Sequence, residues 1–402
     1  MYVFKKIAQV SSSEFEGLWK PQLHMIGAIV WGHLECYFVQ DADQHKDSNM
    51  EATVVARCLD LTQAKLAAKG CDLPRSLIVQ TDGTSAEANN QHFMTFEAFM
   101  TSSNCFEATD LNKLTTAHSH NEQDQRFSVC ATKIARASIL ENPDEFVQCI
   151  KDNVPPAGGR ELVVEILPST YNFQKWFMPL NIQVAGIAAT HLEPNTNHVW
   201  RIVQRRALLD SGITDDAIEC LHSDWSDLDP DPKDAILLVK HYMHSSTWSQ
   251  APMLLLPAVV AATLKRDDLT VLGSAPLGER AIKEWRKTAR QVAKEPWNLF
   301  KAQKYLEDLC DNNVTGTQPA PIPLNFIHNA GRSDLAKVAV SAHLLGFEPH
   351  DMPPVRRVEA TAPNLREAGR RAKAHAPAVS EAPGVAKAQS HGPGCCNFAM
   401  LL

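Results

Sequence analysis

The chain has 402 residues, a hydrophobic content of 44% and a net charge of −7, with 39 Lys and Arg against 46 Asp and Glu. A chain of this length usually folds into two or three domains and can bury a sizeable core. Its acidic balance excludes a generally basic nucleic-acid binder, although a local basic face remains compatible with it.

The ten cysteines form no Cys-x-x-Cys pair, which argues against a zinc knuckle and for free thiols in a reducing compartment. The first residues lack the apolar centre of a signal peptide. The longest apolar run, Pro252 to Leu264, is too short to span a membrane. We therefore expect an intracellular protein with no membrane partner.

The first elements expected along the chain are a hairpin and a helix. Two apolar runs, Met25–Trp31 and Leu34–Val39, flank Gly32-His33, which predicts a tight β-hairpin. Asn49 is a suitable N-cap for a helix over Asn49–Lys69, with Gly70 as its stop.

A buried strand comes next. The apolar run Leu77–Val79 leads into Asp82-Gly83, a pattern typical of a buried parallel strand and the turn after it. Glu87–Ser103 has helical spacing, and Glu107–Thr116 is expected as a weak strand. The later elements expected are a helix over 142–152, strands at Leu162–Leu167 and His198–Arg205, and helices at Ala235–His244 and Glu279–Asp311.

These elements divide the chain into three expected parts. Strands and helices alternate up to residue 206, which indicates an α/β domain with a mixed sheet and flanking helices over 1–206. The segment 207–315 is expected to be a small helical domain. Residues 316–402 are rich in Pro and Ala with little periodicity, and we expect a largely disordered tail there.

Acids and imidazoles gather between the buried strand and the next helix. Asp82 follows the strand at the edge where open α/β sheets place ligands. His118, His120 and Asp124 lie within seven positions. Counting back three residues from Phe127 puts Asp124 on the inward face of the first helical turn, where it could point to the same spot as Asp82. Such oxygen and nitrogen donors suit a divalent metal ion.

Each of these residues also has a structural interpretation. Asp82-Gly83 is a common turn signal, and Glu87 suits the first turn of a helix. His118 and His120 can be hydrogen-bonded loop residues. A His-x-His pair followed by acids also leaves open a metal-dependent hydrolase that uses these two histidines, although Asn121-Glu-Gln123 breaks the metallo-β-lactamase pattern.

Two motifs resemble those of a known family. Leu73-Pro-Arg-Ser-Leu-Ile-Val-Gln-Thr-Asp-Gly-Thr-Ser-Ala-Glu-Ala-Asn-Asn90 is similar to its pattern of Leu-Pro, an apolar strand, Asp-Asn and then Glu-Asn-Lys-Asn. Ala117-His-Ser-His-Asn-Glu-Gln-Asp-Gln125 resembles its Gly-His-Thr-His followed by acids and Asp-Gln. The family is a transposon-derived eukaryotic domain, similar to the RNase H-like fold of DDE-type transposases and integrases. The resemblance covers roughly residues 15–205.

The resemblance implies a metal-dependent polynucleotidyl transferase or nuclease that acts on DNA. It implies Asp82, Asp124 and Glu87 as catalytic residues, and Asp82, His118, His120 and Asp124 as ligands of Mg²⁺ or Mn²⁺. Enzymes of this fold use two ions about 3.5–4 Å apart. One carboxylate normally bridges them, and the resemblance places that acid on the first, central strand.

The first acid is the main departure from the family. The family carries it on a strand upstream of the segment that begins at Trp19, where this chain offers only Glu14 and Glu16. In addition, Gly83 replaces an Asn and Ala117 replaces a Gly. We therefore expect an amino terminus truncated relative to the family, a single metal ion at most, and impaired catalysis.

The alternative function is a non-catalytic module on the same fold that binds DNA or protein. The tail carries a basic patch, for which a solvated segment, a nuclear-targeting signal and a nucleic-acid contact are all open interpretations. We also expect that the protein can form a homo-oligomer. The candidate nucleic-acid-binding residues of the tail are Arg356, Arg357, Arg370 and Arg371.

Overall fold

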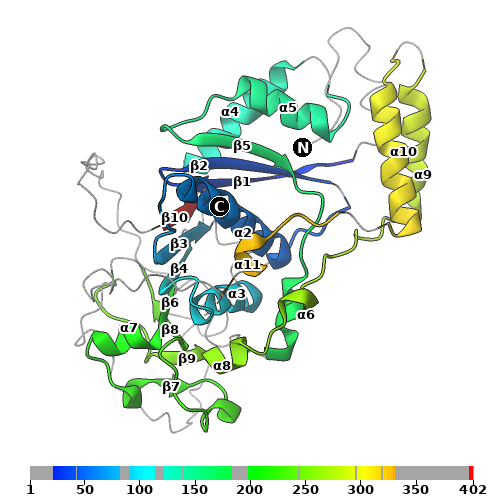
Figure 1. Cartoon of the computed structure of the whole chain (residues 1–402). Coiled ribbons are helices and arrows are strands. Elements are labelled where there is room, and N and C mark those ends of the chain that lie inside the picture. The colour runs from blue at the N-terminus through cyan, green and yellow to red at the C-terminus, as the bar shows by residue number, and fades with distance from the viewer. Residues whose placement is uncertain are drawn as a thin grey trace, which may run out of the picture.

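A mixed sheet of ten described strands, with helices on both faces, organises the molecule (Figure 1). This computed structural model describes residues 21–41, 43–81, 90–113, 122–137, 140–180, 182, 198–242, 245–294, 297–317, 320–328, 330 and 398–401. The expectation of an α/β fold with a mixed sheet is confirmed.

The strands come from both ends of the described chain. In spatial order they are β5 (Glu161–Ile166), β2 (Leu34–Gln40), β1 (His24–Val30), β10 (Phe398–Leu401), β3 (Ser76–Thr81), β4 (Ala108–Lys113), β6 (Val199–Gln204), β8 (Ala235–Lys240), β9 (Met253–Leu256) and β7 (Glu219–Cys220). Pairing is antiparallel for β2–β1, β1–β10, β4–β6, β6–β8 and β8–β9, and parallel for the other neighbours.

Local sequence signals account for the first elements. The β1–β2 hairpin turns at Gly32, whose φ of +75° favours glycine. The next helix, α2 (Ser48–Ala67), is capped by Asp47, whose carboxylate accepts hydrogen bonds from the backbone N–H groups of residues 49 and 50. Asn49 was therefore the wrong cap residue. Its side chain instead accepts a hydrogen bond from the backbone of Gln174.

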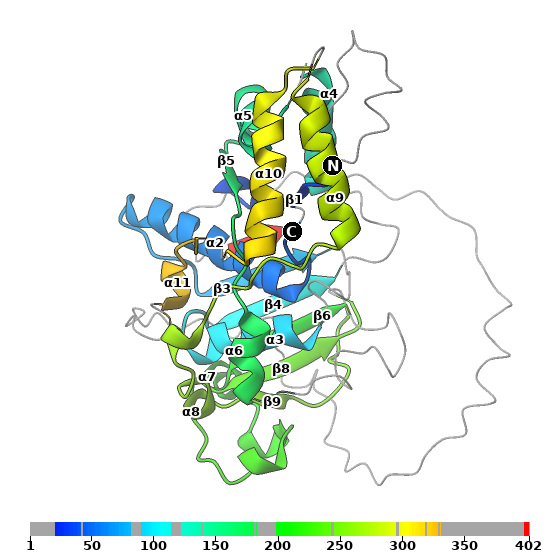
Figure 2. The same ribbon diagram turned by 90° about the vertical axis from the view of Figure 1, so that its right-hand side faces the viewer.

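Helices cover the two faces of the sheet. One face carries α2 with α3 (Gln91–Ser102), α6 (Phe173–Phe177) and α11 (Asn325–His328); the other carries α4 (Glu122–Arg136), α5 (Pro143–Asn153), α9 (Glu279–Val292) and α10 (Phe300–Thr315). The helices α9 and α10 stand side by side at the end occupied by α4 and α5 (Figure 2). Two short helices, α7 (Arg205–Asp210) and α8 (Ala258–Ala261), complete the set. Among the described helices, none is both long and apolar enough to cross a membrane.

Each face has its own buried core. On the α2 side, aromatic rings from α3 and α6 pack together, including Phe99 and Trp176 with ring centres 5.0 Å apart. On the α4 side, Tyr37 and Val39 of β2 pack with Ile134 and with residues of α5, α9 and α10. The cysteines of the described residues are free thiols, as expected.

Two elements differ from the expectation. Ala235–His244 was expected to be helical, but Ala235–Lys240 forms strand β8 between β6 and β9. Its continuous apolar run is buried on both sides, which removes the alternation that usually marks a strand. The segment 207–315, expected to be a small helical domain, thus contributes strands β7, β8 and β9 to the sheet, and its two long helices are α9 and α10. Within the expected disordered tail, Phe398–Leu401 forms strand β10; residues 331–397 lie outside the described residues.

Candidate functional site

The segments predicted to hold a metal ion leave the sheet at one edge. The parallel strands β3 and β4 end together, with Thr81 opposite Lys113. Asp82 is the next residue after β3, and residues 114–121 connect β4 to α4. The topology therefore favours a shared site at this edge, but four of its predicted members lie outside the described residues: Asp82, Glu87, His118 and His120.

Asp124 is the predicted ligand that the structure describes. It lies in the first turn of α4, as expected, but its side chain is exposed. The inward face of α4 consists of Gln123, Arg126, Cys130 and Ile134, all buried. The prediction that Asp124 points inward was therefore wrong. The buried face of α4 begins with two polar residues, Gln123 and Arg126, which the apolar spacing from Phe127 does not reveal. Its role as a ligand stays a prediction.

A glycine in β1 allows α4 to approach the sheet closely. A Cβ atom at Gly27 would lie 1.8 Å from Nε2 of Gln123 and 2.8 Å from the tip of the Phe127 ring. Gln123 is only 2% exposed, and neither polar atom of its side chain has a hydrogen-bond partner among the residues that the structure describes. The first turn of α4 is thus pressed directly onto β1.

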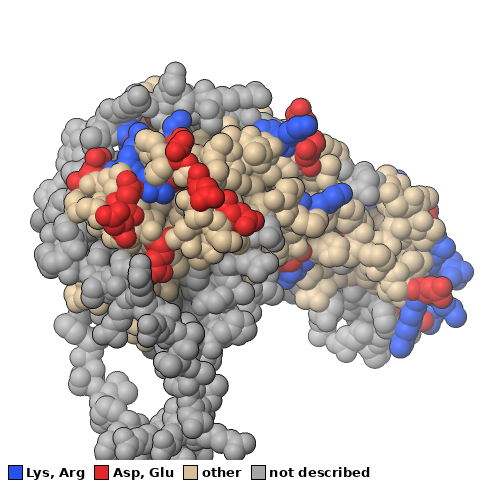
Figure 3. All heavy atoms as spheres, turned by 90° about the horizontal axis from the view of Figure 1, so that it is seen from below, with Lys and Arg blue, Asp and Glu red and all other residues tan. Residues whose placement is uncertain are grey.

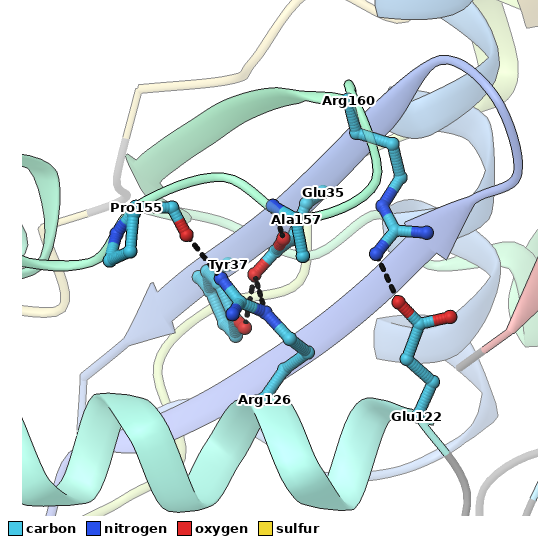
Figure 4. Close-up of polar contacts among 7 residues, drawn as sticks. All are labelled: Glu35, Tyr37, Glu122, Arg126, Pro155, Ala157 and Arg160. Atoms are coloured by element: carbon cyan, nitrogen blue, oxygen red, sulfur yellow. Dashed lines mark hydrogen bonds and ion pairs between the residues drawn. The ribbon is translucent and has the colours of Figure 1, made fainter.

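A buried ion pair holds that contact in place (Figure 4). Oε1 of Glu35 accepts hydrogen bonds from Nε of Arg126 at 2.6 Å and from the hydroxyl of Tyr37 at 2.7 Å. Its Oε2 accepts the backbone N–H of Ala157 at 3.2 Å, and Arg126 also donates to the carbonyl of Pro155 at 2.6 Å. Burial and the bond to Glu35 raise the pKa of Tyr37. This acid therefore joins β2, α4 and the loop before β5, which is a structural role.

A second pair fixes the start of the same helix. Glu122, the first residue of α4, accepts a hydrogen bond from Arg160, which is 6% exposed and directly precedes β5 (Figure 4). The guanidinium of Arg160 also lies 5.8 Å from the ring centre of Trp31. Arg126 thus ties α4 to β2, Arg160 ties the first residue of α4 to the start of β5, and each of the two acids has an arginine as its counter-ion.

The acids of the neighbouring strand and helix are paired or buried. Asp110 of β4 accepts a hydrogen bond from Nε of Arg201 at 2.6 Å, across the β4–β6 pair. Glu97 of α3 is fully buried, and within the described part of the chain neither of its carboxyl oxygens has a hydrogen-bond partner. Burial, with a smaller contribution from the charge of Asp110, raises the pKa of Glu97 well above its usual value.

The described residues do not assemble a metal site on their own. Within them, no three His, Cys, Asp or Glu side chains lie close enough together to hold a metal ion. The predicted ion, Mg²⁺ or Mn²⁺, depends on Asp82, His118 and His120 and stays a prediction.

The strand between β1 and β3 bears on the first acid that the family resemblance implies. This central place is taken by β10, with the sequence Phe-Ala-Met-Leu, which contains no carboxylate. It runs parallel to β3 and antiparallel to β1. Met400 is 1% exposed and packs in the core on the α2 side. Of the two strands beside β3, β10 is apolar, whereas β4 carries Asp110, which is bound by Arg201.

Comparison with known families gives one match. A family described as "Domain of unknown function (DUF7869)" matches residues 13–201, which include strands β1 to β5 and the first part of β6. The sheet edge at β3, β4 and α4 lies inside this match. No curated protein and no solved structure matches the chain.

Surface charge is distributed unevenly. Seen from below, acids gather on the lobe at the left, whereas Lys and Arg stand among a few acids at the right-hand end, where α9 and α10 lie (Figure 3). The acidic lobe comprises residues 210–231, with the exposed side chains Asp210, Asp215, Asp216, Glu219, Asp224, Asp227 and Asp229. The basic face of α9 comprises the exposed side chains Arg280, Lys283, Arg286, Lys287 and Arg290.

The basic face of α9 was missed by the sequence reasoning. Its residues recur at helical spacing, opposite the buried positions Trp285, Ala289 and Val292, and that spacing was the available signal. The arginines of the tail that were expected to contact nucleic acid lie outside the described residues: Arg356, Arg357, Arg370 and Arg371.

Proposed function

We propose that the chain is an RNase H-like, transposase-derived module of the polynucleotidyl transferase type whose catalysis is impaired. The motifs around Asp82 and His118 support the RNase H-like part of this proposal, and one observation carries the impairment: the central strand beside β3 is β10, and none of its four residues is an acid. In the fold that the motifs resemble, the acid that bridges two metal ions comes from a central strand. Asp82 and Asp124, with the histidines, then supply ligands for one ion.

The other nearby acids support the same conclusion. Two close divalent ions require several carboxylate oxygens that are free to bind them. Glu35 and Glu122 are bound by Arg126 and Arg160, and Asp110 is bound by Arg201. None of these three acids replaces the bridging ligand without giving up its arginine, which would leave a partly buried cation without its counter-ion.

A nuclease assay tests the impairment. The full chain is incubated with single- and double-stranded DNA and either Mg²⁺ or Mn²⁺. We expect no more cleavage from the unmodified chain than from Asp82→Asn. Asp227→Asn is the matched control, because Asp227 is an exposed acid of the lobe. Cleavage that is lost in Asp82→Asn and kept in Asp227→Asn would refute the proposal.

A second candidate, a non-catalytic DNA-binding module, is favoured by the basic face of α9. This helix carries five exposed Lys and Arg side chains and only two acids, Glu279 and Glu284. It is therefore net positive within a chain of net charge −7. Ion pairs of Arg286 with Asp311 and of Lys287 with Glu284 offset part of that charge. A phosphate backbone would approach this end and be repelled by the acidic lobe.

Salt-dependent DNA binding tests the second candidate. We expect the triple variant Arg280→Glu/Lys283→Glu/Lys287→Glu to weaken binding and to flatten its dependence on salt. The control triple variant, Lys69→Glu/Lys151→Glu/Lys175→Glu, makes the same change of net charge at exposed lysines elsewhere. Equal losses in the two variants would show an effect of net charge alone and would exclude α9 as the contact.

A further inference from the structure

Strand β10 reaches the middle of the sheet from a distant part of the sequence. Residues 398–401 pair with Leu77–Gln80 of β3, and residues 400–401 pair with Ile29–Val30 of β1. The preceding described residue is Ala330. Residues 331–397 form the only covalent connection, and their Pro/Ala-rich composition does not dictate which copy of the chain supplies the strand.

The two strands beside β10, β1 and β3, are each held in place by other parts of the fold. Strand β1 is paired along its whole length with β2, and β3 is paired along its whole length with β4. Helix α2 packs on β1 and β2, α3 packs on β4, and the two helices pack against each other. The helices therefore connect the two halves of the sheet independently of β10. We expect the gap between β1 and β3 to stay open when β10 dissociates.

We propose that the gap between β1 and β3 is a strand-acceptor site, and that a second copy of this chain can supply residues 398–401 to it. This inference does not rest on the proposed function. The site recognises an extended peptide through backbone hydrogen bonds on both edges, as in other cases of strand addition. An apolar side chain at the position of Met400 is required, because that position is buried beside Val30 and Val79, which are themselves fully buried.

The first experiment measures acceptance of a free strand by the full chain. Met400→Asp disables the chain's own strand, because it would bury a charge in the apolar core. The ligand is a fluorescent synthetic peptide with the sequence of residues 397–402. By polarisation, we expect Met400→Asp to bind it about ten-fold or more tightly than the unmodified chain, whose site is already filled. Met178→Asp, at a methionine that is 67% exposed, should behave like the unmodified chain.

Two results of that experiment would overturn the acceptor site. One is a folded Met400→Asp chain that does not bind the peptide. The other is equal binding of a peptide in which Asp replaces the methionine. If Met400→Asp does not fold, hydrogen exchange on the unmodified, isotope-labelled chain decides: excess peptide should accelerate exchange of the chain's own amides at 398–401 and leave β2 unchanged. No acceleration would overturn the proposal.

The second experiment tests supply by another copy. Two differently labelled preparations of the unmodified chain are mixed at high concentration and followed by energy transfer and size exclusion. We expect slowly forming dimers that excess peptide dissociates, and none from Met400→Asp alone. A chain that stays monomeric at every concentration, or dimers that form equally well with Met400→Asp, would refute strand supply in trans.

Discussion

Removing Arg126 should destabilise the protein far more than removing an exposed arginine. Its partner Glu35 is 0% exposed, and Arg126→Met would leave that carboxylate with the Tyr37 hydroxyl and the Ala157 N–H as its remaining donors. Breaking one side of a buried pair typically lowers the free energy of unfolding by about 3–5 kcal/mol. Because two donors remain, we expect a value near the lower end, about 3 kcal/mol.

The assay is urea-induced unfolding at neutral pH, with the midpoint and slope measured for each variant. Arg286→Met is the control, because Arg286 and its partner Asp311 are 47% and 65% exposed, and such a pair contributes about 0–1 kcal/mol. The double variant Arg126→Met/Glu35→Leu should recover most of the loss, since no buried charge remains. A loss for Arg126→Met as small as that of the control, or a double variant no more stable than the single one, would refute this reasoning.

Three further predictions concern the buried acids and the α4 contact. Burial raises the pKa of Asp41 to about 6, against an ordinary 3.8, although a hydrogen bond from Tyr305 opposes the shift. The contribution of Asp41 to stability should therefore fall as pH rises from 3.8 through 6. The free energy of unfolding of Asp41→Asn in urea should exceed that of the parent by up to about 3 kcal/mol at pH 7 and equal it at pH 3. Burial raises the pKa of Glu97, so the contribution of Glu97 to stability is greatest below pH 4.5, and the advantage of Glu97→Gln should grow above that pH by at most about 1.4 kcal/mol per pH unit. A pH-independent difference between the variant and the parent would contradict this assignment. Gly27→Ala should destabilise by about 1–3 kcal/mol because Gln123 and Phe127 occupy the space of the new methyl group, whereas Gly278→Ala, with open space around it, should change thermal stability little.

Much of the first half of the fold could be predicted because its signals are local. The hairpin at Gly32, the helix that follows Asp47 and the strand before Asp82 each depend on a few neighbouring residues. Strand β8 could not be distinguished from a helix, because its run Ala-Ile-Leu-Leu-Val is apolar at every position. Strand β10 was missed because it has only four residues. The strands with which it pairs are more than 300 positions away in the sequence.

The place of the candidate site stays a prediction, because four of its members lie outside the described residues. The sequence predicted that the ends of β3 and β4 lie near the start of α4, because a parallel strand pair and the helix that follows it share one edge of the sheet. It could not reveal that Arg126 and Gln123 face inward, because their burial depends on Glu35 and Gly27 in distant strands. Polar residues at buried positions have no periodic signal that separates them from a solvated face.

Strand β10 links the two main proposals, yet they can fail separately. Cleavage by the unmodified chain that requires Asp82 would show that catalysis does not need an acid on β10, and it would leave the acceptor site between β1 and β3 untouched. If the chain does not bind the free peptide, β10 is a permanent part of the sheet. The position between β1 and β3 then still lacks a carboxylate. If instead β10 exchanges, the position beside β3 is occupied by this strand only part of the time. The absence of an acid there is then a property of β10 and not of the neighbouring strands β1 and β3.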